Sequence, residues 1–224
     1  MNTIKQIIKN ALNEDVIKND ITTSSFLTKN PPKTAQLITK ETGIFFGNSI
    51  IKTSINIIDP SIQIGTCIND GQSIPKGTLI TTLTGPVKSL LILERTLLNF
   101  IQRLSGIATQ TRQLITILNN PNIKILDTRK TTPGLRALEK QAVLAGGGHN
   151  HRHNLSDMIL IKENHLAQIL SENTIEQFKE KLIKSKRVNP QINIEIEIES
   201  INQLNTLPLE HVDIIMLDNF KHQE

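Results

Sequence analysis

The sequence predicts an α/β protein, and three features of the chain support this. Short apolar runs separated by Gly and Pro fill the part of the chain before Gly85-Pro86. A long helical stripe follows, and from Asn122 onward short apolar runs alternate with helical segments. Such alternation is typical of a parallel sheet with crossover helices. The sheet is expected either to carry helices on both faces or to curl toward a barrel.

Composition narrows the class of protein and its partners. The 224 residues, 38% of them hydrophobic, are enough for one large domain or for a small domain joined to a larger one. Six Phe and no Trp or Tyr leave few rings on which nucleic-acid bases could stack. The formal charge of +4 arises from 25 cationic and 21 anionic side chains that are dispersed along the chain. This pattern favours small acidic ligands over nucleic acid.

The lack of a membrane-spanning stretch and the use of cysteine predict a soluble, cytoplasmic protein. No stretch approaches the roughly 18 uninterrupted apolar residues of a membrane span, so no membrane segment is expected. Cys67 is the single cysteine, which excludes an intrachain disulfide and favours a reducing compartment. We expect it to be a small buried hydrophobe rather than a nucleophile.

The first half of the chain is expected to hold an amphipathic helix, a small α+β module and a long helical stretch. Apolar residues at helical spacing predict an amphipathic helix over Met1–Leu12. Gly and Pro then separate short strands such as Ala35–Ile38 and Thr78–Leu83. The stripe from Leu90 to Leu118 predicts one long helix or two helices in series.

In the second half, four strands are expected to alternate with helices. The strands are Ile123–Asp127, Met158–Lys162, Ile192–Ile198 and Val212–Asp218, and the helices are Leu135–Ala145, Glu163–Ser185 and Ser200–Leu204. Thr132 is expected to cap the first of these helices, with Pro133 in its first turn and Gly146 at its end.

Charged residues stand at the carboxyl ends of three of these strands. Asp127-Thr128-Arg129-Lys130 follows the first strand, Lys162 ends the second and Asp218 ends the last. The carboxyl ends of parallel strands share one rim, where the active sites of α/β proteins are built. A single strand often ends in a solvated charge. Three strand ends that together carry positive and negative charges predict a common site.

The third expected strand has an acidic face. Within Ile192–Ile198 the isoleucines alternate with Asn193, Glu195 and Glu197, and Glu199 follows. If helices cover the aliphatic face, the carboxylates point inward and require Arg, Lys or a divalent metal. The alternative is an edge strand whose acidic face is solvated.

A glycine run precedes a segment rich in cationic residues. Gly146-Gly147-Gly148 permits close backbone approach to a ligand, and Arg152 offers a planar fork for a carboxylate or phosphate. His149, His151 and His153 would share one face of an extended segment. Zinc is one interpretation, but no Cys or acidic ligand accompanies them, so anion binding is preferred. The run fits neither a P-loop nor a dinucleotide fingerprint, and no nucleophile elbow is present.

Five ordered blocks of the sequence resemble the quinolinate phosphoribosyltransferases, also called carboxylating nicotinate-nucleotide pyrophosphorylases. They are Glu94–Phe100 with Leu104–Thr109, Asp127–Arg136, Gly146–Gly148 with Asn150–Arg152, Leu160–His165, and Met216–Phe220; Glu14-Asp15 and Asp20–Thr22 also match. The resemblance covers nearly the whole chain. It implies an N-terminal α+β sandwich-like domain with a linker helix, residues 1–110, followed by an incomplete parallel β/α barrel, residues 111–224.

The resemblance also implies a reaction. Family members condense quinolinate with phosphoribosyl pyrophosphate, using Mg²⁺, and release nicotinate mononucleotide, pyrophosphate and carbon dioxide for NAD synthesis. Similarity to them implies a homodimer or a higher homo-oligomer in which Arg95 crosses the subunit boundary.

The roles of individual residues follow from the same resemblance. The implied substrate-binding residues are Arg95, Thr128, Arg129, Lys130, His151, Arg152, Lys162, Glu197 and Asp218. Among them, Lys130, Lys162, Glu197 and Asp218 are the catalytic candidates. Glu197 and Asp218 would face the ribose and the Mg²⁺-pyrophosphate. Glu197 is preferred to Glu195 because it precedes Asp218 by 21 residues, the family's usual separation.

The sequence departs from the family pattern at its C-terminal side. Six residues follow Asp218, whereas the family continues through further strand-helix units with Gly-rich phosphate-binding loops. We therefore expect an unclosed barrel and an unpaired edge on the last strand. One interpretation is an enzyme completed by a longer chain or a second polypeptide; another is a truncated, non-catalytic remnant that binds quinolinate only. A related type II phosphoribosyltransferase or a transport-associated paralogue is a third, but the paired arginines favour the dicarboxylate quinolinate.

Overall fold

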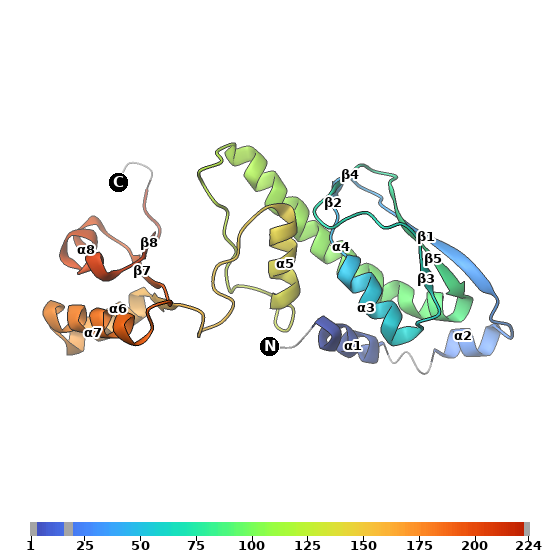
Figure 1. Cartoon of the computed structure of the whole chain (residues 1–224), viewed down its shortest axis with the longest axis horizontal. Coiled ribbons are helices and arrows are strands. Elements are labelled where there is room, and N and C mark those ends of the chain that lie inside the picture. The colour runs from blue at the N-terminus through green and yellow to red at the C-terminus, as the bar shows by residue number, and fades with distance from the viewer. Residues whose placement is uncertain (1–3, 16–19, 222–224) are drawn as a thin grey trace. The chain divides into compact units, whose positions relative to one another are not determined.

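The chain folds into two compact units, Met1–His151 and Arg152–Glu224. The computed structural model in Figure 1 describes residues 4–15 and 20–221. Met1–Thr3, at the start of the first expected helix, lie outside the described residues. The domain boundary expected at residue 110 falls inside a continuous helix and stays a prediction.

The first unit is an α+β module with a long helix. Its elements are α1 (Ile4–Glu14), α2 (Ile21–Phe26), β1 (Pro32–Ile38), β2 (Gly43–Ile44), α3 (Asn48–Ile58), β3 (Gln63–Ile64), β4 (Ser73–Ile74), β5 (Leu79–Pro86), α4 (Val87–Leu118) and α5 (Arg136–Gly146). Strands β1, β5 and β3 form an antiparallel sheet in that order, and β2 pairs with β4. The strands expected around Ala35–Ile38 and Thr78–Leu83 are therefore present as β1 and β5.

Helix α4 is one uninterrupted helix, which settles the choice between one helix and two. Gly106 does not break it, and its backbone hydrogen bonds continue to a left-handed Asn119 at the C-terminal cap. Its buried face, which includes Leu97, Leu104 and Ala108, joins the apolar core of this unit. Helices α3 and α5 pack against it, as Figure 1 shows.

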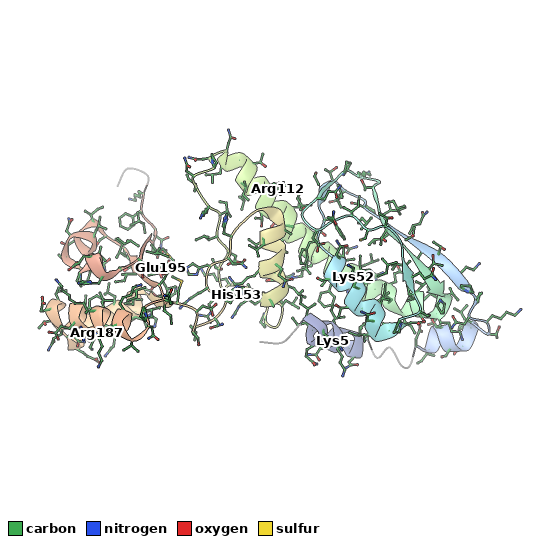
Figure 2. All side chains as sticks on the ribbon, in the orientation of Figure 1. Lys5, Lys52, Arg112, His153, Arg187 and Glu195 are labelled. Carbon is green, nitrogen blue, oxygen red and sulfur yellow. The ribbon has the colours of Figure 1, made fainter. Side chains whose placement is uncertain are left out.

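The carboxyl end of α5 lies very close to α4. A Cβ built on Gly146 would stand 2.5 Å from the Ala108 carbonyl oxygen. Arg112, labelled on α4 in Figure 2, donates from Nε to the Gly146 carbonyl at 2.8 Å. Glycine is needed here because any larger residue would push the two helices apart.

Two local details of α5 differ from expectation. Its N-cap is Leu135, without a side-chain cap, so Thr132 is not the capping residue. At the other end Gly147, with φ of 96°, is the C-cap, one residue beyond the Gly146 expected to close the helix. A left-handed residue is favoured at this position, and glycine adopts it without steric cost.

The prediction of a strand at Ile123–Asp127 is wrong, because the segment forms no regular strand. The segment forms a single parallel bridge between Leu126 and His149. The backbone amide of His149 donates to the Ile125 carbonyl at 2.8 Å, and that of Asp127 donates to the His149 carbonyl at 3.1 Å. The segment therefore runs beside the residues after the glycine run without entering a sheet.

The second unit is a small parallel α/β assembly. Its elements are β6 (Ile159–Ile161), α6 (Glu163–Glu172), α7 (Ile175–Val188), β7 (Ile194–Ile198), α8 (Ile201–Thr206), the 3₁₀ turn η2 (Leu209–His211) and β8 (Ile214–Leu217). The strands are parallel in the order β6-β7-β8, as expected from the alternation in the sequence. Within the described residues, β8 pairs with β7 alone.

The helical region expected at Glu163–Ser185 is divided into α6 and α7. The Thr174 side chain accepts from the Gln177 amide at 3.3 Å, and the Gln177 side chain accepts from the Thr174 amide at 2.8 Å. This capping box starts a new helix at that point. Phe178 and Leu182 of α7 then pack with the buried isoleucines of β7. None of the helices among the described residues has the length and apolar character that a membrane crossing requires.

Candidate active site

In the first unit, Asp127 joins the two segments that carry most of the predicted quinolinate-binding residues. Its Oδ1 accepts from the backbone amide of His151 at 2.9 Å and from the Lys140 ammonium. The Asp127 side chain is 8% exposed and that of Lys140 only 1%. Asp127 was expected to be a site charge at a strand end, but it is instead a buried anchor.

The side-chain amide of Asn150 adds to this anchor when its oxygen and nitrogen are exchanged, because the nitrogen then faces two acceptors. In that orientation its nitrogen donates to Asp127 Oδ2 at 2.6 Å and to the Lys140 carbonyl at 3.0 Å. Both carboxylate oxygens of Asp127 are thereby bonded. The Asn150-His151 segment is held beside the start of the loop that contains Thr128, Arg129 and Lys130.

The loop from Thr128 to Thr131 turns on short local hydrogen bonds. The Lys130 amide donates to Thr128 Oγ1 at 3.0 Å, and the Thr131 amide donates to the Arg129 carbonyl at 2.9 Å. Arg129 Nε is buried and has no hydrogen-bond partner among the described residues. An unpaired guanidinium nitrogen is costly in a buried position, so this atom is suited to receive an anionic ligand.

The end of the same loop is held by Glu139 of α5. Its Oε2 accepts from the Thr132 amide at 3.1 Å, and its Oε1 accepts from Arg103 Nε at 3.0 Å. Burial raises the pKa of Glu139, but the hydrogen bonds from Arg103 and Thr132 outweigh it, so the pKa lies below its ordinary value. Glu139 is therefore an anionic anchor at neutral pH.

In the second unit, the carboxyl ends of the three strands bring Lys162, Glu197 and Asp218 to one rim. Lys162 directly follows β6, and its Nζ lies 3.2 Å from Glu197 Oε2. This is an ion-pair distance without hydrogen-bond geometry, because Glu197 Oε2 has no hydrogen-bond partner among the described residues. The Asp218 amide donates to the Ile198 carbonyl at 2.9 Å and extends the β7–β8 ladder.

The acidic face of β7 is buried, so the interpretation as a solvated edge strand is wrong for Glu195 and Glu197. They are 2% and 7% exposed, on the central strand of the sheet. Glu195 lies on β7 in Figure 2. Glu199, beyond the end of the strand, is exposed. Met216 is the register partner of Glu197, and strand alternation returns Asp218 to the face of Met216.

The remaining predicted residues stand at separate places in the two units. Arg152 is the first residue of the second unit, and its Nη1 donates to the Met158 carbonyl at 3.5 Å. Arg95 is exposed on α4 in the first unit.

The donor set on the rim of the second unit fits a hard cation. Carboxylate oxygens are the ligands that Mg²⁺ prefers, and Glu197 contributes a buried oxygen without a hydrogen-bond partner. Among the residues that the structure describes, no group of three or more His, Cys, Asp or Glu side chains could hold a metal ion by itself. Mg²⁺ in protein sites usually retains water and substrate phosphate oxygens, so its sites often have only one or two protein carboxylates.

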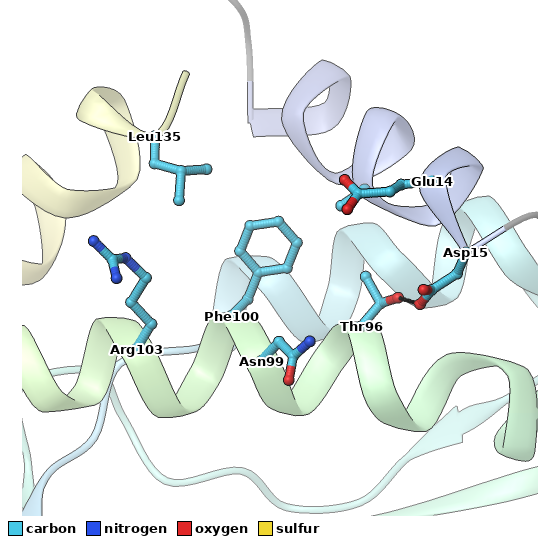
Figure 3. Close-up of a pocket in the computed structure, with 8 residues that line it drawn as sticks. Glu14, Asp15, Thr96, Asn99, Phe100, Arg103 and Leu135 are labelled. Atoms are coloured by element: carbon cyan, nitrogen blue, oxygen red, sulfur yellow. Dashed lines mark hydrogen bonds between the residues drawn. The ribbon is translucent and has the colours of Figure 1, made fainter. Parts of the chain in front are cut away.

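A cavity of about 180 Å³ lies elsewhere in the first unit, between α1, α4 and Leu135. Figure 3 shows Asp15, Thr96 and Arg103 at its wall, and Thr96 Oγ1 donates to Asp15 Oδ2 at 2.5 Å. Its lining includes none of the predicted site residues. Asp15 and Asp20, which the sequence resemblance included, have structural roles here, because Asp20 caps α2 by accepting from the Thr23 amide at 3.0 Å.

Sequence reasoning missed Glu139 and Lys140 as anchors of the loop. The sequence feature that could have identified them is a pair of successive charged residues beside Leu138 and Ala142, which lie on the buried side of α5. The partners of these charges are distant in the sequence, so helical periodicity alone does not identify them.

Comparison with known proteins supports the same assignment. Residues 20–105 match the family described as "Quinolinate phosphoribosyl transferase, N-terminal domain", and residues 107–224 match the corresponding C-terminal domain. The "Probable nicotinate-nucleotide pyrophosphorylase [carboxylating]" of Bacillus subtilis is 43% identical over 216 residues. That alignment covers 96% of this chain and 73% of the relative. A tobacco mitochondrial quinolinate phosphoribosyltransferase is 34% identical, and the alignment covers 56% of its length.

Solved structures agree. The nicotinate-nucleotide pyrophosphorylase of Ehrlichia chaffeensis is 36% identical and superposes with a TM-score of 0.88, covering 100% of this chain and 79% of that chain. The enzyme of Francisella tularensis, at 37% identity, gives a TM-score of 0.85 over 99% of this chain and 78% of that chain. The α/β fold expected from the sequence is thus confirmed. The chain belongs to the quinolinate phosphoribosyltransferase family.

Proposed function

We propose that the chain transfers the phosphoribosyl group of phosphoribosyl pyrophosphate to quinolinate and decarboxylates the product. The products are nicotinate mononucleotide, pyrophosphate and carbon dioxide, a step of de novo NAD biosynthesis. The family match over both domains supports this reaction over a remnant that binds quinolinate only. The structural observation that carries the proposal is the buried Nε of Arg129, which lacks a partner among the described residues.

Quinolinate is a dianion, and planar forked cations are its natural partners. Arg129 stands two residues after Asp127, which is bonded to His151. By resemblance to the family, we assign Arg129, His151 and Arg152 to the two carboxylates, because guanidinium groups can donate two parallel hydrogen bonds to a carboxylate. Thr128 and Lys130 add a hydroxyl and an ammonium group from the same loop.

The transfer step needs position and charge more than covalent chemistry. The lone pair of the pyridine nitrogen forms a bond to the anomeric carbon while the bond from that carbon to pyrophosphate oxygen breaks, and pyrophosphate departs with the electron pair. Holding both reactants in this alignment supplies much of the rate enhancement. By the same resemblance, we assign Lys130 and Lys162 to balancing the negative charge of substrate and leaving group.

Decarboxylation follows on the bound product. The ring nitrogen is now cationic, so the electrons of the bond to the adjacent carboxylate remain on the ring carbon as carbon dioxide leaves. That carbon then takes a proton. The role of the chain in this step is to keep the second carboxylate fixed by its cations while the first one departs.

Glu197 and Asp218 face the ribose and the pyrophosphate. Their carboxylates offset the positive charge that develops on the ribose as its bond to pyrophosphate breaks. They would also hold Mg²⁺, which neutralises pyrophosphate charge when bound. The Lys162–Glu197 distance of 3.2 Å supports this assignment, since it places a cationic group beside the buried Glu197 carboxylate.

Assembly and compartment are part of the proposal. A homodimer or higher homo-oligomer brings the exposed Arg95 of one subunit to the quinolinate of another. A cytoplasmic location is in keeping with the single Cys67, which is a free thiol.

Two measurements on the purified chain test the proposal. Incubation with quinolinate, phosphoribosyl pyrophosphate and Mg²⁺ should yield nicotinate mononucleotide and carbon dioxide in equal amounts. Calorimetric titration with quinolinate should show saturable binding. Quinolinate binding without turnover would support the non-catalytic remnant instead. Absence of both would overturn the proposed function.

A further inference from the structure

Helix α5 carries two successive charged residues on its buried side. Glu139 is 7% exposed and Lys140 is 1% exposed. Charged side chains are almost never fully buried unless they are paired. The partners of these two residues therefore show what the helix holds in place.

Lys140 is bonded to the start of the site loop, a name used here for residues 127–132. The Lys140 ammonium donates to Asp127 Oδ1 and, at 2.9 Å, to the His151 carbonyl oxygen. The His151 amide returns to Asp127 Oδ1 at 2.9 Å. Lys140 thus bonds both the first residue of the loop and the backbone of His151.

Glu139 holds the other end of the same loop. It accepts from the backbone amide of Thr132 at 3.1 Å and from Arg103 of α4 at 3.0 Å. The intervening residues, Thr128 to Thr131, make the short local bonds already described. The path of the loop is therefore set by the two anchors on α5.

We infer that Glu139 and Lys140 are positioning residues for quinolinate. This inference rests on the proposed function and deepens it. The Lys140–Asp127 pair fixes the spacing between Arg129 and His151, and Glu139 fixes the direction in which the loop leaves that point. Neither anchor needs to touch substrate, because its effect passes through the loop backbone.

The energetics of buried ion pairs allow two effects of the Lys140–Asp127 pair to be measured separately. One is its effect on quinolinate binding, and the other is its effect on the stability of the fold. Removal of one partner leaves an uncompensated buried charge and is strongly destabilising, whereas replacement of both by neutral groups is often tolerated. If Lys140 and Asp127 served only to stabilise the fold, a neutral pair that restores stability would also restore quinolinate binding.

The test compares the variants Lys140→Met, Asp127→Asn and the double variant. Each is measured for melting temperature and for quinolinate affinity by calorimetry. Both single variants should melt at lower temperature than the wild type. The double variant should recover most of the melting temperature, while its quinolinate Kd stays roughly 10-fold or more above wild type, since the bond from Lys140 to His151 is absent.

A matched control removes an ion pair of the second unit, which contains no residue of the site loop. Lys179 of α7 lies 2.9 Å from Glu210, and Lys179→Met should leave quinolinate affinity unchanged. Glu139→Gln serves as an independent test of the second anchor. It keeps the side-chain shape, and it should raise the KM for quinolinate more than the KM for phosphoribosyl pyrophosphate.

The outcomes separate this inference from the proposed function. Wild-type affinity in the double variant, or equal changes of both KM values in Glu139→Gln, would show a purely structural role and overturn the inference. If the double variant stays unstable, the Glu139→Gln comparison decides by itself. A wild-type chain that neither binds nor converts quinolinate removes the proposed function, and the inference with it.

Discussion

Lys162 Nζ lies 3.2 Å from Glu197 Oε2, across two neighbouring parallel strands. The pair joins the residue that follows β6 to a buried carboxylate of β7. The oxygen makes no hydrogen bond to the described residues, so the ion pair leaves it able to accept from a ligand. This geometry indicates a group prepared for substrate rather than a closed structural bridge.

Glu197→Gln should therefore reduce kcat with little loss of stability. The amide keeps the shape but cannot offset charge at the ribose, and loss of one preorganised electrostatic group costs about 10²- to 10³-fold in kcat. Steady-state rates with both substrates at saturation check this. The matched control is Glu199→Gln, an exposed carboxylate two residues away, which should behave as wild type. Equal losses in the two variants would contradict the role of Glu197.

Arg129→Lys should raise the KM for quinolinate by roughly 10- to 100-fold. Lysine retains the charge but loses the planar fork, and hydrogen bonds to charged groups contribute about 1.5–3 kcal/mol each. The KM for phosphoribosyl pyrophosphate should change much less. Initial-rate measurements with each substrate varied in turn distinguish the two. Arg187→Lys, at an exposed position of α7, is the control and should alter neither value.

Two glycine-to-alanine substitutions should have opposite effects on stability. At Gly146 the added Cβ would meet the Ala108 carbonyl at 2.5 Å, so we expect a loss of about 1–3 kcal/mol. At Gly106 nothing lies within 4 Å of the added Cβ, so the better helix propensity of alanine should raise stability by up to about 1 kcal/mol. Thermal unfolding of both variants measures these changes. A stable Gly146→Ala protein would show that α4 and α5 are less closely packed.

Glu139 should make stability depend on pH on the acid side. Its pKa is lowered in the folded state, because hydrogen bonds from Arg103 and Thr132 outweigh the effect of burial. Its contribution is therefore present above the ordinary value of 4.5 and is lost as pH falls through the folded pKa. The melting temperatures of wild type and Glu139→Gln should differ at pH 7 and converge toward pH 3. A constant difference across this range would exclude the ionised Glu139 as its source.

Local sequence patterns predicted most of the elements because those elements depend on local periodicity. The alternation in Ile194–Ile198 identified β7, and the stripe along α4 identified its buried face. The division of α6 from α7 was missed because the capping box at Thr174 lies within an otherwise continuous helical composition.

Long-range pairing limited the prediction of the site. Asp127 carries the charge expected at a strand end, yet its carboxylate is buried. It is paired there with Lys140, which lies 13 residues away in the sequence. The segment before it makes one bridge to His149 instead of a strand, because its partner is a loop. On the second unit's rim, Lys162 and Glu197 lie at an ion-pair distance of 3.2 Å, and the catalytic roles of all these residues stay predictions.

Helix α4 runs without a break across the junction of the two family domains, which lies between residues 105 and 107. Its later turns pack against α5, which belongs to the C-terminal family domain. A continuous helix that packs against α5 in this way couples the opening of α4 to the opening of α5. Buried amide protons of α4 and α5 should consequently exchange with solvent at a common free energy of opening, as one cooperative unit that spans the junction of the two family domains.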